Sequence, residues 1–178
     1  NGSNFLDGLN TLVIGYYILV LTIIVLTSYQ FNLEINLNIY SFINILSVVF
    51  LFNFFNKIYL GDAGSYLISF LVAFFLLDFF SKNDSVSPYF ICLLLWYPAF
   101  ENLFSIIRRV FLKRNIDQAD EGHLHQMIYR ILKNKDYINK KYINTATAML
   151  INLFNLTIFI FSYKYYFFII NLVLVIFV

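Results

Sequence analysis

Two aspartates stand next to a glycine at the start of long apolar stretches. Asp7 precedes Gly8 in "NGSNFLDGLN", and Asp62 follows Gly61 in "NKIYLGDAGS". A carboxylate in such a position can cap the free N–H groups of a helix. It can also bind Mg²⁺ together with a phosphate at the helix N-terminus, because proteins usually hold Mg²⁺ by one or two carboxylates and by substrate phosphates. The residues alone leave both roles open for each aspartate.

The two histidines of the chain lie two positions apart, in "ADEGHLHQMIYR". At about 100° per residue, such side chains point about 200° apart on a regular helix, so His123 and His125 can meet one ligand only where the backbone is irregular. A zinc site would need i, i+4 spacing or further Cys and His ligands, which the neighbouring sequence lacks. We therefore expect the histidines to bind an anion, with Arg108 and Arg109 nearby. A solvated interfacial loop is the alternative.

A further acidic residue, Glu101, lies in a run that is otherwise apolar from Tyr89 onward. An ionisable group at membrane depth is a candidate functional residue by default. Glu101 also lies about two turns before Arg108, and it could instead reach the interface and pair with an arginine there. Both interpretations remain open from the sequence.

Composition indicates that the bilayer surrounds these residues. Of 178 residues, 61% are hydrophobic and 12% charged, against about 25% charged in an ordinary soluble domain. One water-soluble core of this size could not bury so much apolar surface. The single Cys92 excludes a disulfide framework. No basic region precedes the first apolar run, so we expect no cleavable signal peptide; without an initiator Met, we expect a fragment of a longer chain.

Apolar runs of roughly 20 residues predict spanning helices. About six are present, at 9–28, 37–55, 64–81, 88–107, 145–162 and 165–178. Apolar residues at i, i+3, i+4 and i+7 within 115–135 predict an amphipathic helix along the membrane surface, with Asp120 as its N-cap. The predicted fold is all-α: one integral membrane domain over 1–178, with about six transmembrane helices and one amphipathic cytoplasmic helix.

The distribution of Lys and Arg predicts the orientation. Ten of the 12 basic residues fall in alternate loops: Lys57, Arg108, Arg109, Lys113, Arg114, Arg130, Lys133, Lys135, Lys140 and Lys141. Lys82 and Lys164 fall in the others. Since basic loops stay in the cytoplasm, we expect segments 1–10, 56–65 and 108–144 together on the cytoplasmic side of a multi-pass plasma-membrane protein.

Four stretches, in order, resemble motifs of the polyprenyl-phosphate N-acetylhexosamine-1-phosphate transferases. "NGSNFLDGLN" resembles N-x-x-N-x-x-D-G-x-D, and "NFFNKIYLGDAGS", with Asn53 and Lys57, resembles N-F-x-x-x-K/R-I-F-L-G-D-x-G-S. "YPAFENLFSIIRR" resembles P-x-x-D-x-x-x-x-x-x-R-R, and "ADEGHLHQ" resembles A-D-x-x-H-L-H-H. The resemblance covers essentially the whole chain but only the C-terminal part of the family's fold. The family's paired-aspartate motif would precede Asn1.

The chain departs from these motifs at a few positions. Asn10 and Glu101 stand where the family has Asp, and Gln126 replaces a third His. Ile68-Ser69 replaces the usual Leu-Gly. These changes affect substrate detail more than reaction class, and the "HLHQ" form favours a UDP-N-acetylhexosamine over UDP-MurNAc-pentapeptide.

The resemblance implies an activity and a site. Such enzymes transfer N-acetylhexosamine-1-phosphate from a UDP-sugar, here UDP-GlcNAc or a related UDP-HexNAc, to a polyprenyl phosphate such as undecaprenyl phosphate, and release UMP. This is the first membrane step of a cell-surface glycan pathway, at a bacterial inner membrane. By resemblance the catalytic residues are Asp7, Asp62, His123 and His125, and the two aspartates bind Mg²⁺ or Mn²⁺. The substrate-binding residues implied are Asn4, Gly8, Leu9, Asn10, Asn53, Lys57, Arg108 and Arg109.

Other functions compete with this one. A small transporter would explain the apolar helices, but transporter sites usually lie near the bilayer midplane. An inactive remnant or membrane scaffold is a second alternative, because the paired aspartates are absent from the sequence in hand. We expect no nucleic-acid partner, and a homodimer is left open.

Overall fold

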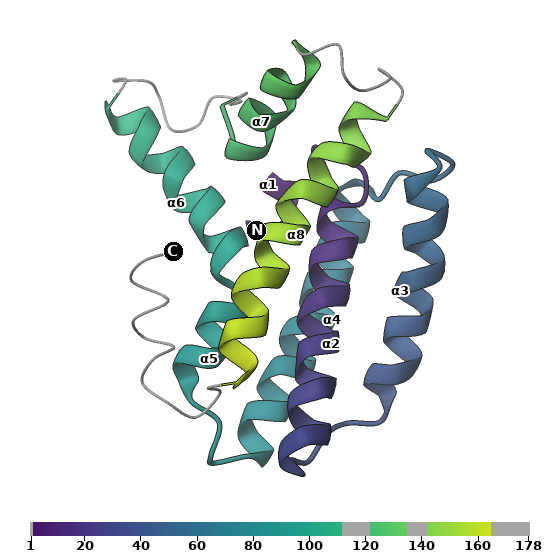
Figure 1. The fold of residues 1–178 in the computed structure, drawn as a ribbon, viewed down its shortest axis with the longest axis vertical. Coiled ribbons are helices and arrows are strands. Elements are labelled where there is room, and N and C mark those ends of the chain that lie inside the picture. Colours follow the sequence, from purple (N-terminus) through teal and green to yellow (C-terminus); the bar gives the residue numbers. More distant parts are fainter. Residues whose placement is uncertain (1, 112–121, 135–141, 165–178) are drawn as a thin grey trace.

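The computed structural model describes residues 2–111, 122–134 and 142–164, and within them the chain forms helices (Figure 1). In chain order these helices are α1 (Gly2–Leu6), α2 (Leu12–Phe31), α3 (Asn38–Phe54), α4 (Gly61–Lys82), α5 (Pro88–Leu94), α6 (Trp96–Phe111), α7 (Leu124–Lys133) and α8 (Ile143–Lys164). The all-α prediction is confirmed for this part of the chain.

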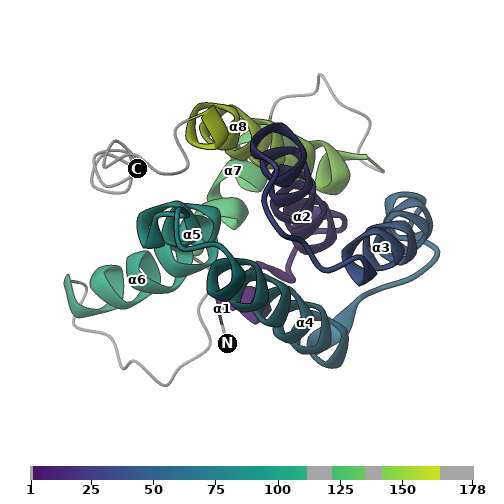
Figure 2. The same cartoon turned by 90° about the horizontal axis from the view of Figure 1, so that it is seen from below.

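Helix α2 forms the centre of the bundle. It packs against α8 most extensively and also against α3 and α4, and the end-on view shows it surrounded by them (Figure 2). Its residues are apolar on all sides and mostly buried, as expected for a central helix. Tyr16, Leu21 and Ile24 are among its fully buried side chains.

Several helices are able to span a membrane. Leu12–Phe31, Gly61–Lys82 and Ile143–Lys164 are long and apolar enough, and α5 and α6 together form a fourth candidate. The chain is therefore a polytopic membrane protein. The count of about six is not confirmed, since run 37–55 forms a shorter helix of 17 residues, and run 165–178 lies outside the described residues.

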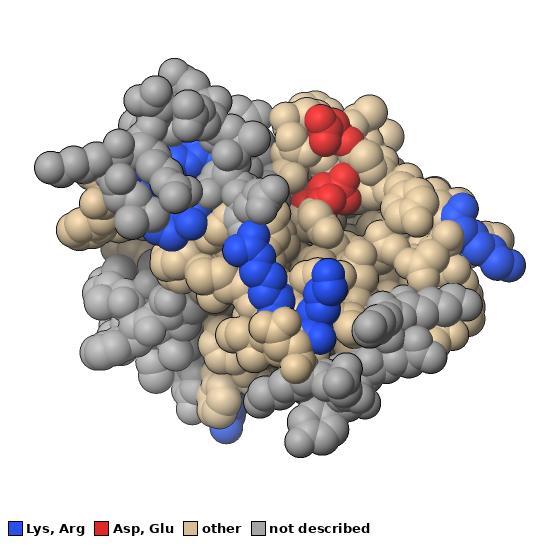
Figure 3. Space-filling model, turned by 90° about the horizontal axis from the view of Figure 1, so that it is seen from above, with Lys and Arg blue, Asp and Glu red and all other residues tan. Residues whose placement is uncertain are grey.

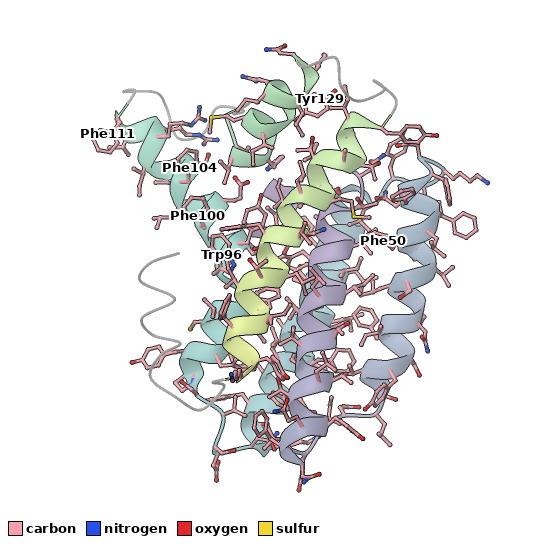
Figure 4. All side chains as sticks on the ribbon, in the orientation of Figure 1. Phe50, Trp96, Phe100, Phe104, Phe111 and Tyr129 are labelled. Atoms are coloured by element: carbon pink, nitrogen blue, oxygen red, sulfur yellow. The ribbon has the colours of Figure 1, made fainter. Side chains whose placement is uncertain are left out.

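The predicted continuous span 88–107 is wrong, because α5 and α6 meet at a bend of 66°. Pro98 explains the break: it has no N–H to donate to the carbonyl of Leu94 four residues earlier, and its ring disfavours a straight helix there. The hydroxyl of Tyr16 donates instead to that carbonyl, at 2.8 Å. Beyond the bend α6 leans away from the bundle, with Trp96, Phe100, Phe104 and Phe111 following one another along it (Figure 4).

The amphipathic helix is confirmed but shorter than predicted. Helix α7 begins at Leu124, and its N-cap is His123, in extended conformation. Asp120, the predicted N-cap, lies outside the described residues. The helix packs against α8, and its residues Leu124, Ile128 and Tyr129 contact the core.

The polar segments lie at one end of the bundle. In Figure 1 this upper end holds α1, the α3–α4 connection and α7, while the α2–α3 and α4–α5 connections lie at the opposite end. Lys82 and Lys164 are the last residues of α4 and α8, at that opposite end. The prediction that the unusual polar stretches share one face is therefore confirmed for the described residues.

Candidate active site

Both aspartates of the predicted site lie at the polar end without capping a helix. Asp7 is half-buried in the turn after α1, and Asp62 is exposed in the first turn of α4. The N-cap residues of α2 and α4 are Thr11 and Leu60, so neither aspartate occupies a cap position. The capping interpretation is wrong for both.

The two carboxylates influence each other electrostatically. Burial, and next the negative charge of Asp62, raise the pKa of Asp7 from 3.8 to about 6. Such carboxylates favour a proton or a cation between them, since either relieves their repulsion. Figure 3 looks onto the polar end and shows acidic side chains close together, with Lys and Arg side chains across from them.

Gly61 allows the chain to turn into α4 directly before Asp62. Its φ of +65° lies in the left-handed region, which glycine adopts without strain. Nothing lies within 4 Å of the place where a Cβ would stand, so the backbone conformation, not crowding, favours glycine here.

Asparagines hold the aspartate-bearing loops in place. Asn53 is 3% exposed; its Oδ1 accepts the N–H of Thr11, and its Nδ2 donates to the carbonyl of Ile58 at 2.7 Å. The side chain of Asn10 donates to Asn56. The loop after Asp7 and the loop before Asp62 are thus tied together, and Asn53, predicted to bind substrate, positions both.

Further hydrogen bonds attach the N-terminal motif to two long helices. The N–H of Asn10 donates to Oδ1 of Asn144 in α8 at 3.0 Å. Nδ2 of Asn4 donates to the hydroxyl of Tyr66 in α4 at 3.2 Å. The predicted substrate residues Asn4 and Asn10 therefore also fix the backbone around Asp7.

Glu101 holds the histidine segment. Its carboxylate is fully buried. It accepts hydrogen bonds from the Tyr97 hydroxyl at 2.9 Å, from the backbone N–H of Leu124 and of His125 at 3.1 Å each, and from Nδ1 of His125 at 3.0 Å. Nδ1 of His123 lies 3.6 Å from Oε2. The interpretation of Glu101 as an interfacial residue is wrong: its carboxylate faces inward, to the histidines.

The histidine backbone is irregular, as the two-residue spacing required. His123 is extended and precedes the first helical residue, so the two rings can lie on one side. They stack with centroids 5.5 Å apart and planes 13° apart. Nε2 of His125 is buried without a hydrogen-bond partner among the described residues, and a Cβ on Gly8 would lie 2.9 Å from it. The histidine segment and the Asp7–Gly8 turn are therefore in contact.

The predicted basic residues are placed in different ways. The guanidinium of Arg108 packs against Gly122, leaving no room for a Cβ, and so lies next to the histidines. Arg109 follows it near the end of α6. Lys57 is exposed just after α3, where its N–H donates to the carbonyl of Phe52 at 2.9 Å and closes the helix end.

A cleft of about 460 Å³ opens between the Asp7–Gly8 turn and α7. It is lined by Gly8, Leu9, Gln126, Tyr129, Arg130, Lys133 and Asn144. Its volume falls in the range of about 300–1,000 Å³ typical of small-molecule sites. Of the implied substrate residues it contains Gly8 and Leu9, the latter mostly buried.

Sequence reasoning missed some of these residues. In the sequence, Tyr129 stands out only as part of an amphipathic segment, and Arg130 and Lys133 only as basic residues that indicate orientation; nothing in their spacing indicates a cleft. Glu101 was recognised as unusual, but the sequence gives no sign that it contacts a segment 22 residues later. No group of three or more His, Cys, Asp or Glu side chains suited to a metal occurs among the described residues.

Comparison with known proteins agrees with the motifs. Residues 1–80 match the model of glycosyl transferase family 4. The chain is 28% identical, over 131 residues, to a probable undecaprenyl-phosphate N-acetylglucosaminyl 1-phosphate transferase of Bacillus subtilis (strain 168), covering 72% of this chain and 37% of that protein.

A second relative comes from Thermotoga maritima. It is an undecaprenyl-phosphate alpha-N-acetylglucosaminyl 1-phosphate transferase, 31% identical over 74 residues, which cover 42% of this chain and 24% of that protein. The aligned parts thus span 37% of the first relative and 24% of the second. No solved structure matches the chain. The resemblance seen in the motifs is confirmed at this partial coverage: residues 1–80 are similar to glycosyl transferase family 4, and the two relatives carry matching names.

Proposed function

We propose that this chain forms the catalytic end of an enzyme that transfers N-acetylhexosamine-1-phosphate from a UDP-sugar to a polyprenyl phosphate and releases UMP. The observation that carries the proposal is the pair Asp7 and Asp62, two carboxylates on separate glycine turns at the polar end of the bundle. Burial, and next the negative charge of Asp62, raise the pKa of Asp7. The relatives' names specify undecaprenyl phosphate and N-acetylglucosaminyl 1-phosphate transfer, so UDP-GlcNAc is the first donor to test.

The reaction is a phosphoryl transfer. An oxygen of the lipid phosphate attacks the β-phosphorus of the UDP-sugar; a new P–O bond forms, the bond between the β-phosphorus and the bridging oxygen breaks, and UMP leaves with that oxygen. Such reactions depend on positioning and charge neutralisation. The cationic side of the cleft, with Arg130 and Lys133, and Lys57 at the same end would attract the anionic donor.

The two aspartates suit a divalent metal. Mg²⁺ binds through one or two carboxylates together with substrate phosphates and does not need a closed protein cage. Asp62 is exposed and Asp7 half-buried, so both carboxylates are accessible to a metal–phosphate complex. Bound there, Mg²⁺ or Mn²⁺ would neutralise charge on the pyrophosphate. The residues present fit the metal.

The site would face the cytoplasm of a bacterial inner membrane. The positive-inside rule supports this orientation, because the end of the bundle that carries the aspartates holds five of the described basic residues: Lys57, Arg108, Arg109, Arg130 and Lys133. A UDP-sugar would then reach the site from water, while the polyprenyl chain lies in the bilayer beside the apolar helices.

The test is UMP release from UDP-GlcNAc and undecaprenyl phosphate by the complete enzyme in membranes. Asp62→Asn should lower the rate by about 10²- to 10³-fold, as expected when a charge-stabilising group is lost. Asp78→Asn is the matched control, because Asp78 pairs with Lys82 at the opposite end. Turnover of Asp62→Asn within a few-fold of the control would overturn the metal assignment.

A further inference from the structure

The environment of His125 leaves one ring nitrogen unused. Nδ1 lies 3.0 Å from the Glu101 carboxylate, which as an acceptor requires the proton to be on Nδ1. Nε2 is fully buried and without a partner among the described residues. Native proteins contain few such atoms, and each requires an explanation.

The unused nitrogen is directed at the aspartate loop. Only a glycine at position 8 leaves room for it, since a Cβ there would lie 2.9 Å from Nε2. Gly8 is exposed and lines the cleft, and Asp7 is its neighbour. A ligand bound over the Asp7–Gly8 turn would therefore lie within reach of Nε2 after a small side-chain adjustment.

We propose that Glu101 is a positioning residue for the transfer reaction: it holds His125 so that Nε2 is presented to the phosphates of the donor at the Asp7–Gly8 turn. This inference rests on the proposed function. A ring that donates from Nδ1 to a carboxylate accepts at Nε2 when it is neutral and donates from Nε2 when it is protonated. A carboxylate that orients a histidine in this manner is a recurring arrangement in enzyme sites.

Glu101 also stabilises the start of α7, and this structural role can be separated by experiment from its positioning of His125. It accepts the backbone N–H groups of Leu124 and His125, which the start of α7 would otherwise leave without partners. Glu101→Gln can keep an acceptor oxygen for the N–H and Nδ1 of His125, but it places an NH2 group opposite the N–H of Leu124 and removes the negative charge from Nδ1. Glu101→Asp keeps the charge on a shorter side chain. A purely structural Glu101 would tolerate Gln about as well as Asp, whereas a positioning carboxylate requires Asp.

The experiment combines kinetics with a spectroscopic measurement on the complete enzyme in nanodiscs. For Glu101→Gln we expect KM for UDP-GlcNAc to rise about 10- to 100-fold, as for other residues that orient a ligand-binding histidine. Glu101→Asp should recover most of this loss. Asp78→Asn, which removes a carboxylate at the other end of the molecule, should match the unchanged enzyme.

The spectroscopic measurement does not depend on turnover. In protein labelled with ¹⁵N-histidine, the His125 signals are identified by their loss in His125→Gln. UDP should shift the Nε2 signal, and Glu101→Gln should weaken UDP binding by about tenfold or more. Gly8→Ala leaves Glu101 intact but crowds Nε2, and it should weaken UDP binding similarly. It provides a second variant for the UDP-binding measurement if Glu101→Gln does not fold.

The outcomes separate the two proposals. If the unchanged enzyme releases UMP but Glu101→Gln retains its KM and its UDP affinity, the inference is wrong and the proposed function stands. If the unchanged enzyme binds UDP through His125 in a Glu101-dependent manner but releases no UMP, the proposed function is wrong and the positioning role of Glu101 toward phosphates stands.

Discussion

The polar end of this molecule holds carboxylates in two opposite environments. Asp62 is exposed, and its carboxylate has no hydrogen-bond partner within the described part of the chain. Glu101 is fully buried and accepts hydrogen bonds from a tyrosine, two backbone N–H groups and a histidine. The carboxylate of Asp62 is thus available to a ligand, whereas the carboxylate of Glu101 is already occupied by hydrogen bonds from the protein.

This difference indicates which of the two regions binds a ligand and which one stabilises the fold. An exposed carboxylate on a glycine turn contributes little to stability, so its presence is better explained by what it binds. A buried carboxylate with several donors stabilises its surroundings strongly, and it can act on a substrate only through the groups that it holds. Substitutions in the two regions should therefore separate activity from stability.

The largest stability effect is expected from Glu101→Ala. It leaves the hydroxyl of Tyr97 and the N–H groups of Leu124 and His125 without a buried acceptor, which should cost about 3 kcal/mol or more. Thermal unfolding in detergent measures this loss. In the same assay Asp62→Asn should unfold like the unchanged protein. Equal losses for both variants would contradict the division between the two regions.

A smaller loss, about 2 kcal/mol, is expected from Asn53→Ala. The N–H of Thr11 and the carbonyl of Ile58 lose their partner, and buried polar groups without partners cost about 1–3 kcal/mol. Since Asn53 ties together the loops that carry both aspartates, the Mg²⁺ concentration needed for half-maximal activity should also rise. Thr22→Ala is a suitable control, because its hydroxyl only returns to a carbonyl of its own helix. A variant with normal stability and normal Mg²⁺ dependence would contradict the positioning role of Asn53.

The smallest effect on stability is expected from Asp7→Asn, which removes the titratable carboxylate of Asp7. Its pKa is raised to about 6 in the folded chain, above the ordinary 3.8. The folded chain therefore keeps the proton over a range where the unfolded chain loses it, and stability falls as the pH rises toward and through about 6. Asp7→Asn removes this cost: we expect a small rise in the unfolding temperature near neutral pH, which shrinks as the pH falls below about 5. An unfolding temperature that falls near neutral pH would contradict this sign.

The effect of Mg²⁺ on the unfolding temperature tests whether Asp7 and Asp62 bind the ion. If the ion binds between Asp7 and Asp62, it should raise the unfolding temperature of the unchanged protein, because a ligand that binds only the folded state stabilises it. The rise should disappear in Asp7→Asn and in Asp62→Asn, and it should persist in Asp78→Asn. Equal stabilisation of all variants by Mg²⁺ would place the ion elsewhere.

Much of the fold was predictable because apolar runs of spanning length are an unambiguous signal in lipid. The runs that begin near Leu12, Gly61 and Ile143 became long helices within a few residues of the predicted limits. The break at Leu95 was not predicted, although Pro98 was visible in the sequence. Its effect depends on whether another group satisfies the carbonyl that loses its partner, and here Tyr16, far away in sequence, does so.

The residues of the candidate site could be singled out from the sequence, but the contacts among them could not. Glycine turns indicated Asp7 and Asp62, and the histidine spacing indicated an irregular backbone at His123. The link from Glu101 to the histidines, and the contact of His125 with Gly8, depend on tertiary packing. No local pattern contains that information, so the hydrogen-bond partner of Glu101 could not be predicted from the sequence.

The most direct test follows the phosphorus atom itself. UDP-GlcNAc labelled with ³²P in the β-phosphate is incubated with the complete enzyme, undecaprenyl phosphate and Mg²⁺, and the lipid and water phases are then separated. Sugar-1-phosphate transfer predicts that the label moves into the lipid phase while unlabelled UMP appears in water, and that Asp62→Asn slows both by about 10²- to 10³-fold. Label that remains in water, either as UDP after transfer of the sugar alone or as unreacted UDP-GlcNAc, would contradict the account.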